Sequence, residues 1–224
     1  EVYARSLDAT RGGLRRADWW WQNLADHYPA REVAVATLGD RHLGYVIYQR
    51  DPDTFRIVEQ FHDDLDTLLA LARFIGGHRT AYRRFVYTTG NPESLHDLLP
   101  DPSQLQTSVH AYMMARIVDV ADFMQRYPYQ VTDLAPTLIA ITDDYIPENA
   151  GVWSLALDDG QTTFEKAAGT PQISLSIQQL VKATFGVRPL QDAYNLGLID
   201  GDPFTITSVG AAFISRQAQL YDYF

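Results

Sequence analysis

Few residues of this chain stand in a pattern that predicts chemistry. The motifs HExxH, GxSxG, the Walker loop and the EF-hand loop do not occur in it. The chain contains no cysteine, which excludes disulfides, thiolate nucleophiles and cysteine-type zinc sites. Its six histidines lack the spacing of metal ligands: they are His27, His42, His62, His78, His96 and His110. We therefore expect no metal site.

The C-terminal residue, Phe224, can supply a charged group. Its α-carboxylate has an intrinsic pKa of about 3.3–3.7 and is ionised at neutral pH. An alkyl ammonium with a pKa of about 10.4 must lose a proton before its nitrogen can attack a thioester. The tail Leu220-Tyr221-Asp222-Tyr223-Phe224 is too aromatic for a frayed terminus, and we expect its rings to be buried. Two interpretations stay open, a tail that only packs and a carboxylate that acts as a base.

A glycine pair at residues 76–77 raises the question of phosphate binding. A loop of the form [R/Q]xxGx[G/A] that opens a helix holds pyrophosphate with its backbone N–H groups and the helix dipole. The nearest string, residues 73–78, departs from this form at its last position. It also falls at the predicted end of a helix, where the dipole has the wrong sign. We interpret Gly76 as a helix stop.

The first module, residues 1–112, is predicted to be a sheet with helices. Trp19, Trp20 and Trp21 cannot share one helix face, so one or two of them must contact something outside their own helix. Gly39-Asp40-Arg41 predicts a hairpin. The predicted elements are an extended segment at 1–3, helices at 15–27 and 64–75 (the latter capped by Asp64), strands at 32–38, 43–49, 55–61 and 85–88, and a short helix from Pro92.

The second module, residues 113–224, is predicted to have an α+β layout. The net charge is −3 over residues 1–112 and −7 over residues 113–224, which supports a boundary there. Its first helix is capped by Asp119 or Asp122. The predicted strands are 113–118, 138–143, 152–157, 163–165 and 173–175, and the later helices are 176–184, 190–196 and 208–215.

The composition excludes some classes of function. The hydrophobic fraction of 46% supports packed cores. A net charge of −10 argues against nucleic-acid binding and suits a cationic partner. No apolar run approaches the ~18 residues that span a bilayer, and no leader is visible, so we expect a cytoplasmic protein without a membrane partner. Because the sequence opens at Glu1 without methionine, we expect part of a longer protein.

Several strings in order resemble the C-terminal part of Eis-like (enhanced intracellular survival) GNAT N-acetyltransferases. The segment 11–16 with the tryptophan cluster resembles the exit from their N-terminal domain, and residues 74–78 resemble a string of their middle domain. Residues 112–120 followed by 126–128 resemble the entry into their third, sterol-carrier-like domain. That domain's pattern is matched at Asp143, Pro147, Asn149, Gly151 and Trp153, and its terminal aromatic at Phe224.

The resemblance implies an acetyl-CoA-dependent acetyltransferase of amines, lysine-like or aminoglycoside-like. Its fold would be a GNAT-like mixed sheet with helices (residues 1–112) followed by a sterol-carrier-protein-2-like α+β domain (residues 113–224). Acetyl-CoA and a tyrosine acid would belong to an N-terminal GNAT domain upstream, with no cofactor bound in this chain. The α-carboxylate of Phe224 would be the general base. Such enzymes form homo-oligomers.

The same resemblance suggests substrate contacts, each with an alternative. Asp119 could hold a cationic amine or cap a helix. Asp222 could add negative charge beside the base, and we also expect Tyr223 and Trp20 to contact substrate. Asp143 and Asn149 are expected to shape a turn, and Arg116 to be paired structurally. The rival functions are a sterol-carrier-like module that binds an apolar ligand and a scaffold that assembles the oligomer.

Overall fold

The computed structural model of the 224-residue chain describes residues 1–9, 11–90, 101–110 and 114–222. It divides into two compact units. The first unit consists of Glu1–Ser108 together with Ala218–Phe224, and the second of Val109–Gln217. The last seven residues, which the sequence division assigns to the second domain, thus group with the first unit.

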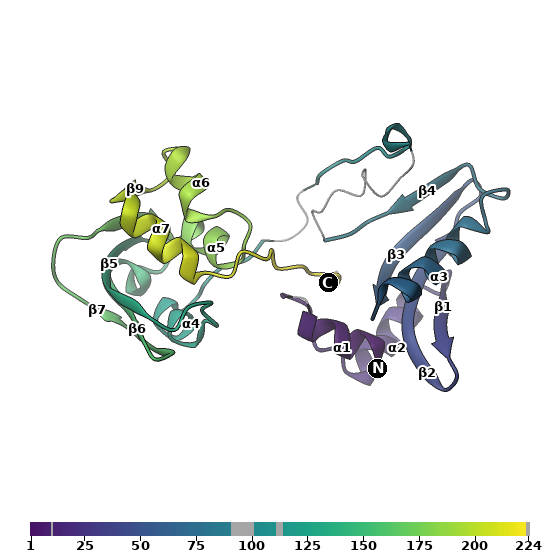
Figure 1. Cartoon of the computed structure of the whole chain (residues 1–224), viewed down its shortest axis with the longest axis horizontal. Coiled ribbons are helices and arrows are strands. Elements are labelled where there is room, and N and C mark those ends of the chain that lie inside the picture. Colours follow the sequence, from purple (N-terminus) through teal and green to yellow (C-terminus); the bar gives the residue numbers. More distant parts are fainter. Residues whose placement is uncertain (10, 91–100, 111–113, 223–224) are drawn as a thin grey trace. The chain divides into compact units, whose positions relative to one another are not determined.

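The first unit is built on a four-stranded sheet of order β1-β2-β3-β4 (Figure 1). The first three strands are antiparallel neighbours, and β4 lies parallel to β3. Gly39, in the predicted hairpin, has a φ of 60°, a conformation that favours glycine. The strands confirm the predicted runs: β1 is Arg31–Leu38, β2 is Arg41–Arg50, β3 is Thr54–His62 and β4 is Arg84–Tyr87.

Helices pack against both faces of this sheet, because successive residues of β2 point to opposite sides. Val46 is buried with Leu71 of α3, while its neighbour Tyr45 packs with Val2 and Tyr3 of α1. The predicted extended segment at residues 1–3 is therefore wrong, because an amphipathic helix buries these two side chains. The helices are α1 (Val2–Ala9), α2 (Asp18–His27) and α3 (Leu65–Gly76), and a 3-10 turn follows at Pro102–Gln104. The short helix predicted from Pro92 lies outside the described residues.

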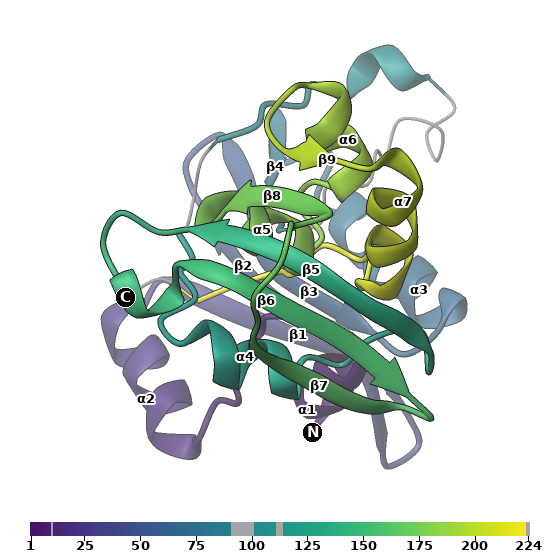
Figure 2. The same cartoon turned by 90° about the vertical axis from the view of Figure 1, so that its left-hand side faces the viewer.

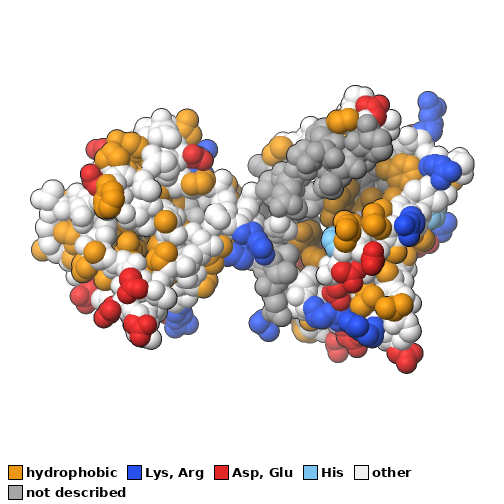
Figure 3. Space-filling model, in the orientation of Figure 1, with side chains coloured by type: hydrophobic (Ala, Val, Ile, Leu, Met, Phe, Trp, Pro, Cys, Tyr) orange, Lys and Arg blue, Asp and Glu red, His pale blue; other side chains and the backbone are white. Residues whose placement is uncertain are grey.

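The first unit leaves part of its apolar surface in contact with solvent. On α3, Leu71 is buried, but Leu65 is 67% exposed and Leu69 is 43% exposed. Figure 3 shows hydrophobic side chains among Lys, Arg, Asp and Glu on this unit. Such mixing is ordinary for a protein surface, so we draw no function from it.

The second unit holds a five-stranded sheet of order β7-β6-β5-β8-β9 (Figure 2). Strands β5 and β8 are parallel, and the other neighbours are antiparallel. Alternate residues of β5 and β6, among them Ile139, Ile141 and Leu155, are buried in one core. The strands are β5 (Leu134–Thr142), β6 (Gly151–Asp158), β7 (Gln161–Lys166), β8 (Ile173–Ser176) and β9 (Asp200–Gly201).

Two predictions for the second unit were wrong. Residues 114–118 form no strand, and Met114 and Val118 are exposed; Met113 lies outside the described residues. The helix predicted at 208–215 begins earlier, because Pro203 occupies its first turn and Asp202 caps it. The helices are α4 (Val120–Arg126), α5 (Ile177–Thr184), α6 (Leu190–Asn195) and α7 (Pro203–Ala212), with a 3-10 turn at Pro147–Asn149.

Candidate functional site

A buried cluster of charges connects the C-terminal tail to the sheet of the first unit. Arg16, in the segment before α2, has a side chain only 1% exposed. Its Nη1 and Nη2 donate to Oε1 and Oε2 of Glu59 at 2.9 Å and 2.5 Å, and its Nε donates to Oδ1 of Asp222 at 2.8 Å. One guanidinium therefore binds a carboxylate from a central strand and a carboxylate from the tail.

Aromatic side chains enclose this cluster. The guanidinium carbon of Arg16 lies 4.2 Å from the ring centroid of Tyr3 and 4.6 Å from that of Trp21, within the range of cation–π attraction. Trp20 donates its indole N–H to Oδ1 of Asp222 at 2.7 Å. The prediction that part of the tryptophan cluster contacts something beyond its own helix is confirmed. Trp19, by contrast, is 69% exposed.

The second carboxylate of the cluster, Glu59, also accepts a hydrogen bond from the hydroxyl of Tyr45. Burial, together with the charge of Glu59, raises the pKa of Tyr45 above its usual value. Burial likewise raises the pKa of Tyr3 to about 12, although Arg16 opposes this. Both phenols are therefore neutral at physiological pH, and Tyr45 acts as a hydrogen-bond donor.

The cluster carries one positive and two negative charges. Burial lowers the pKa of Arg16, but its bonds to Glu59 and Asp222 outweigh this and raise the pKa above its usual value. The Asp222 side chain is 0% exposed. Among the described residues, its Oδ2 has no hydrogen-bond partner, which is unusual for a buried carboxylate oxygen. The net negative charge favours a cation nearby.

The tail reaches this cluster along the segment that precedes α2. The amide of Gln219 donates to the carbonyl of Arg11 at 2.6 Å, and the ring of Tyr221 meets that of Phe61 edge-on at 5.2 Å. Gly12 has a φ of 84°, and a Cβ there would lie 3.1 Å from the Ala218 side chain. The close approach of the two segments therefore depends on glycine.

The structure brings together two of the five predicted site residues, Asp222 and Trp20. Asp222 was expected to stand beside the base, but its Oδ1 is bound by Arg16 and Trp20. Asp119 lies in the second unit and caps α4, accepting from the Asp122 amide at 2.9 Å. Phe224 and Tyr223 lie outside the described residues.

Sequence reasoning missed Arg16, Glu59 and Tyr45. A signal existed for Glu59, because it interrupts an apolar strand at a position that alternates with the buried Ile57 and Phe61. A charged side chain on the buried face of a strand needs a partner of opposite charge. The sequence does not say which of the 18 basic residues provides it.

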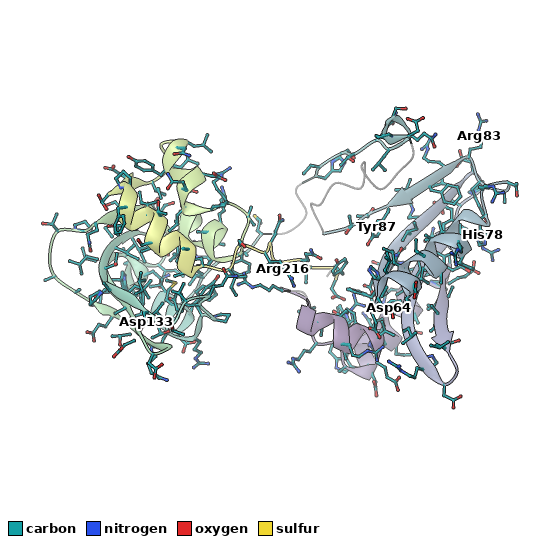
Figure 4. All side chains as sticks on the ribbon, viewed as in Figure 1. Asp64, His78, Arg83, Tyr87, Asp133 and Arg216 are labelled. Carbon is teal, nitrogen blue, oxygen red and sulfur yellow. The ribbon has the colours of Figure 1, made fainter. Side chains whose placement is uncertain are left out.

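Two helix ends bear on phosphate binding. Residues 73–78 lie at the end of α3, where Gly77 is the C-cap, so the interpretation of the glycines as a helix stop is confirmed. At the beginning of α3, Asp64 accepts from the Thr67 amide at 2.8 Å, and Asp63 and Asp66 stand beside it. Figure 4 marks Asp64 and His78 at the two ends. Three carboxylates at a helix N-terminus do not fit the pyrophosphate of CoA.

A second polar cluster lies within the second unit. Asp143 accepts from Arg116 at 2.6 Å, from Asn149 at 3.0 Å and from the backbone amide of Tyr145 at 3.0 Å. Burial would raise the pKa of Asp143, but these hydrogen bonds hold it well below its usual value. The expectations that Asp143 and Asn149 shape a turn and that Arg116 is paired are confirmed.

Each unit also has a surface hollow. In the first unit, a hollow of about 220 Å³ is lined by polar and charged residues including Arg5, Asp40 and His42. In the second, a hollow of about 440 Å³ is lined by Leu134, Pro136 and Leu157 between Asp133 and Asp158. Within the described residues, His, Asp and Glu form no group suited to a metal ion. In the same part of the chain, no helix combines the length and hydrophobicity needed to cross a bilayer.

Comparison with known families finds a similar family for each unit. Residues 12–117 match the family described as "Acetyltransferase (GNAT) domain", and residues 120–221 match that described as "Sterol carrier protein domain". No curated protein matches the chain. The matches confirm the predicted fold class, a GNAT-like sheet with helices followed by a sterol-carrier-like α+β domain.

Solved structures resemble the chain over most of its length. An Enterococcus faecalis protein described as a "probable N-acyltransferase" has 30% identity and a TM-score of 0.89, over 100% of this chain and 57% of its own. A GCN5-related N-acetyltransferase from Anabaena variabilis has 19% identity and a TM-score of 0.81, over 100% of this chain and 58% of its own. Eis1 from Mycobacterium abscessus has 20% identity and a TM-score of 0.66, over 93% of this chain and 55% of its own.

The last two similarities concern the fold alone. The chain spans little more than half the length of each of these three proteins. The acetyltransferase (GNAT) match and the Enterococcus structure agree on the class of the first unit. The chain thus has a GNAT-like unit that is similar to an acetyltransferase domain, followed by a unit similar to a sterol carrier protein domain.

Proposed function

We propose that the chain is the substrate-side part of an acetyl-CoA-dependent N-acetyltransferase of amines, of the Eis-like kind. An N-terminal GNAT domain of the same protein binds acetyl-CoA, and the protein assembles as a homo-oligomer in the cytoplasm. The acetyltransferase domain at residues 12–117 supports the reaction class. The acidic beginning of α3 supports the assignment of the CoA site to the other domain.

The observation that carries the proposal is the burial of Asp222 in the first unit. Arg16 and Trp20 bind its carboxylate at 2.8 Å and 2.7 Å. Phe224, which carries the proposed base, lies two residues beyond Asp222 in the sequence. The tail is thereby held against the acetyltransferase domain up to Asp222, and not in the core of the sterol carrier domain.

In this proposal the α-carboxylate of Phe224 is the general base. It accepts a proton from the substrate ammonium, and the neutral nitrogen then attacks the thioester carbonyl. A general base of this kind contributes about 10²–10⁴-fold to a rate. The excess negative charge of the Arg16 cluster attracts the ammonium. Contacts of Trp20, Asp222 and Tyr223 with the substrate remain part of the proposal.

The test compares three forms of the full-length protein that contains this chain. Deleting Phe224 moves the terminal carboxylate back by one residue, about 3.3–3.6 Å, and turnover of acetyl-CoA with polyamines, lysine-like amines or aminoglycosides is expected to fall at least about 100-fold. The matched control, Phe224→Leu, keeps the carboxylate and loses only the ring, so most activity should remain. Wild-type turnover after the deletion would rule out the base.

A second candidate function is the binding of an apolar ligand by the sterol carrier domain. The hollow beside Leu134 and Leu157 favours it, although Asp133 and Asp158 flank the apolar lining. A fluorescent fatty acid titrated against the protein tests this function. Saturable binding that Leu157→Asp abolishes would support it, and no binding would remove it.

A further inference from the structure

We infer that Arg16 is a latch that holds the C-terminal tail on the first unit, and that it is the positioning residue for the terminal carboxylate. The docking of the tail follows from the geometry of Arg16, Glu59 and Asp222. Its consequence for catalysis rests on the function proposed above.

The three groups differ in their freedom to move. Glu59 belongs to β3, which pairs with β2 on one side and β4 on the other. Its paired guanidinium is fixed by two hydrogen bonds and sits against two aromatic rings. Asp222, in contrast, lies near the end of a seven-residue tail. If the cluster is disturbed, the tail is the part that can leave.

Loss of Arg16 is expected to destabilise the docked position of the tail. It would leave two carboxylates buried without a cation, and such a change is strongly unfavourable. Glu59 is fixed in a central strand and keeps the hydrogen bond from the hydroxyl of Tyr45. Asp222 gains water and removes the repulsion once the tail detaches. Release of the tail is therefore the expected response.

The tail makes other contacts with the first unit. Besides the Arg16 and Trp20 bonds, they include the hydrogen bond from the amide of Gln219 to the carbonyl of Arg11 and the packing of the Tyr221 ring with Phe61 and Tyr3. Neither of these contacts involves a charge. Arg16 therefore accounts for the only ion pair between the described tail and the rest of the unit.

Hydrogen exchange tests the latch directly, using the full-length protein and a peptide that covers residues 214–222. Arg16→Gln is expected to speed exchange of this peptide at least about tenfold, with β2 and β3 unchanged. Arg15→Gln, an exposed neighbour with the same loss of charge, should leave the tail protected. Unchanged protection in Arg16→Gln would overturn the latch.

Two further variants guard against a failure to fold. Glu59→Gln keeps the Arg16–Asp222 pair, so its tail should stay protected; release equal to that of Arg16→Gln would contradict a direct role for Arg16. The double variant Arg16→Met with Glu59→Gln removes the cation and one carboxylate together and is expected to fold with a free tail. A protected tail in this double variant would also overturn the proposal.

Turnover then separates the latch from the proposed base. If Arg16 acts through Phe224, the effects of Arg16→Gln and of deleting Phe224 on kcat do not add. The variant that combines these two changes then has a kcat no lower than that of the more impaired single variant. If the two changes lower kcat independently, so that their factors multiply, Arg16 has only a structural role. If Arg16→Gln has a free tail but full turnover, the base proposal is refuted and the latch proposal stands. If Arg16→Gln keeps a protected tail while deletion of Phe224 abolishes activity, the latch proposal is refuted and the base proposal stands.

Discussion

Nε of Arg16 lies 2.8 Å from Oδ1 of Asp222 across 206 residues of sequence, and both side chains are almost completely buried. Because the same guanidinium binds Glu59 on a central strand, the end of the chain is tied to the middle of a sheet. The tail is thereby part of the first unit.

The indole N–H of Trp20 should contribute to the docking of the tail. Trp20→Phe removes the donor that binds Asp222 at 2.7 Å and is expected to weaken docking by about 1–3 kcal/mol. Trp19→Phe is the matched control, because Trp19 is 69% exposed. Exchange of the tail peptide measures both variants, and equal exchange in the two would contradict a role for Trp20.

Gly12 should be intolerant of a side chain. Gly12→Ala puts a Cβ at 3.1 Å from Ala218 and Gln219 at a φ of 84°, so both strain and crowding act on the tail. Gly39→Ala shares the positive φ but meets no atom within 4 Å, and it isolates the strain. Exchange of the tail peptide is expected to be faster in Gly12→Ala and unchanged in Gly39→Ala. Unchanged exchange in Gly12→Ala would mean that the segments around Gly12 and Ala218 can move apart at little energetic cost.

The second unit should lose stability when Asn149 is truncated. Asn149 is buried, and its side chain satisfies the amide of Val120 and a carboxylate oxygen of Asp143. Asn149→Ala is expected to lower the free energy of unfolding of this unit by about 1–3 kcal/mol. Urea denaturation followed by Trp153 fluorescence measures the change. A loss below a few tenths of a kcal/mol would contradict the structural role of the network.

Asp143 predicts how the same unit responds to acid. Its pKa is held below the usual value by Asn149, backbone amides and Arg116, against the opposing effect of burial. A depressed pKa stabilises the folded state above the unfolded pKa, about 3.9, and this stability is lost as the pH falls below it. The urea concentration at the unfolding midpoint should therefore decrease as the pH is lowered below about 4. Asp143→Asn should reduce the pH dependence of the urea midpoint. If the pH dependence is unchanged in this variant, other carboxylates cause it.

The sequence predicted the elements with strong local patterns. The strands around Val46, Ile57 and Ile139 and the helix capped by Asp64 were predicted because apolar periodicity and capping act within a few residues. Helix α1 was missed because its burial depends on Tyr45 and Phe61, more than 40 residues away. Local pattern carries no information about such distant contacts.

The candidate site was predictable only in part. Asp222 and Trp20 were named from the sequence, and the structure places them in contact. Arg16 and Glu59 are 43 residues apart, and no spacing rule connects a residue before a helix to one in a later strand. The charge of Glu59 on a buried strand face was the one local sign of a partner.

The most direct test of the account is the kcat of full-length protein whose C-terminus has been converted to an amide by semisynthesis. Amidation removes the terminal charge and keeps every side chain, and the tail peptide should remain protected from exchange. The account predicts a fall in kcat of about 10²–10⁴-fold with an amine substrate. Wild-type turnover by an amidated protein with a docked tail would contradict it.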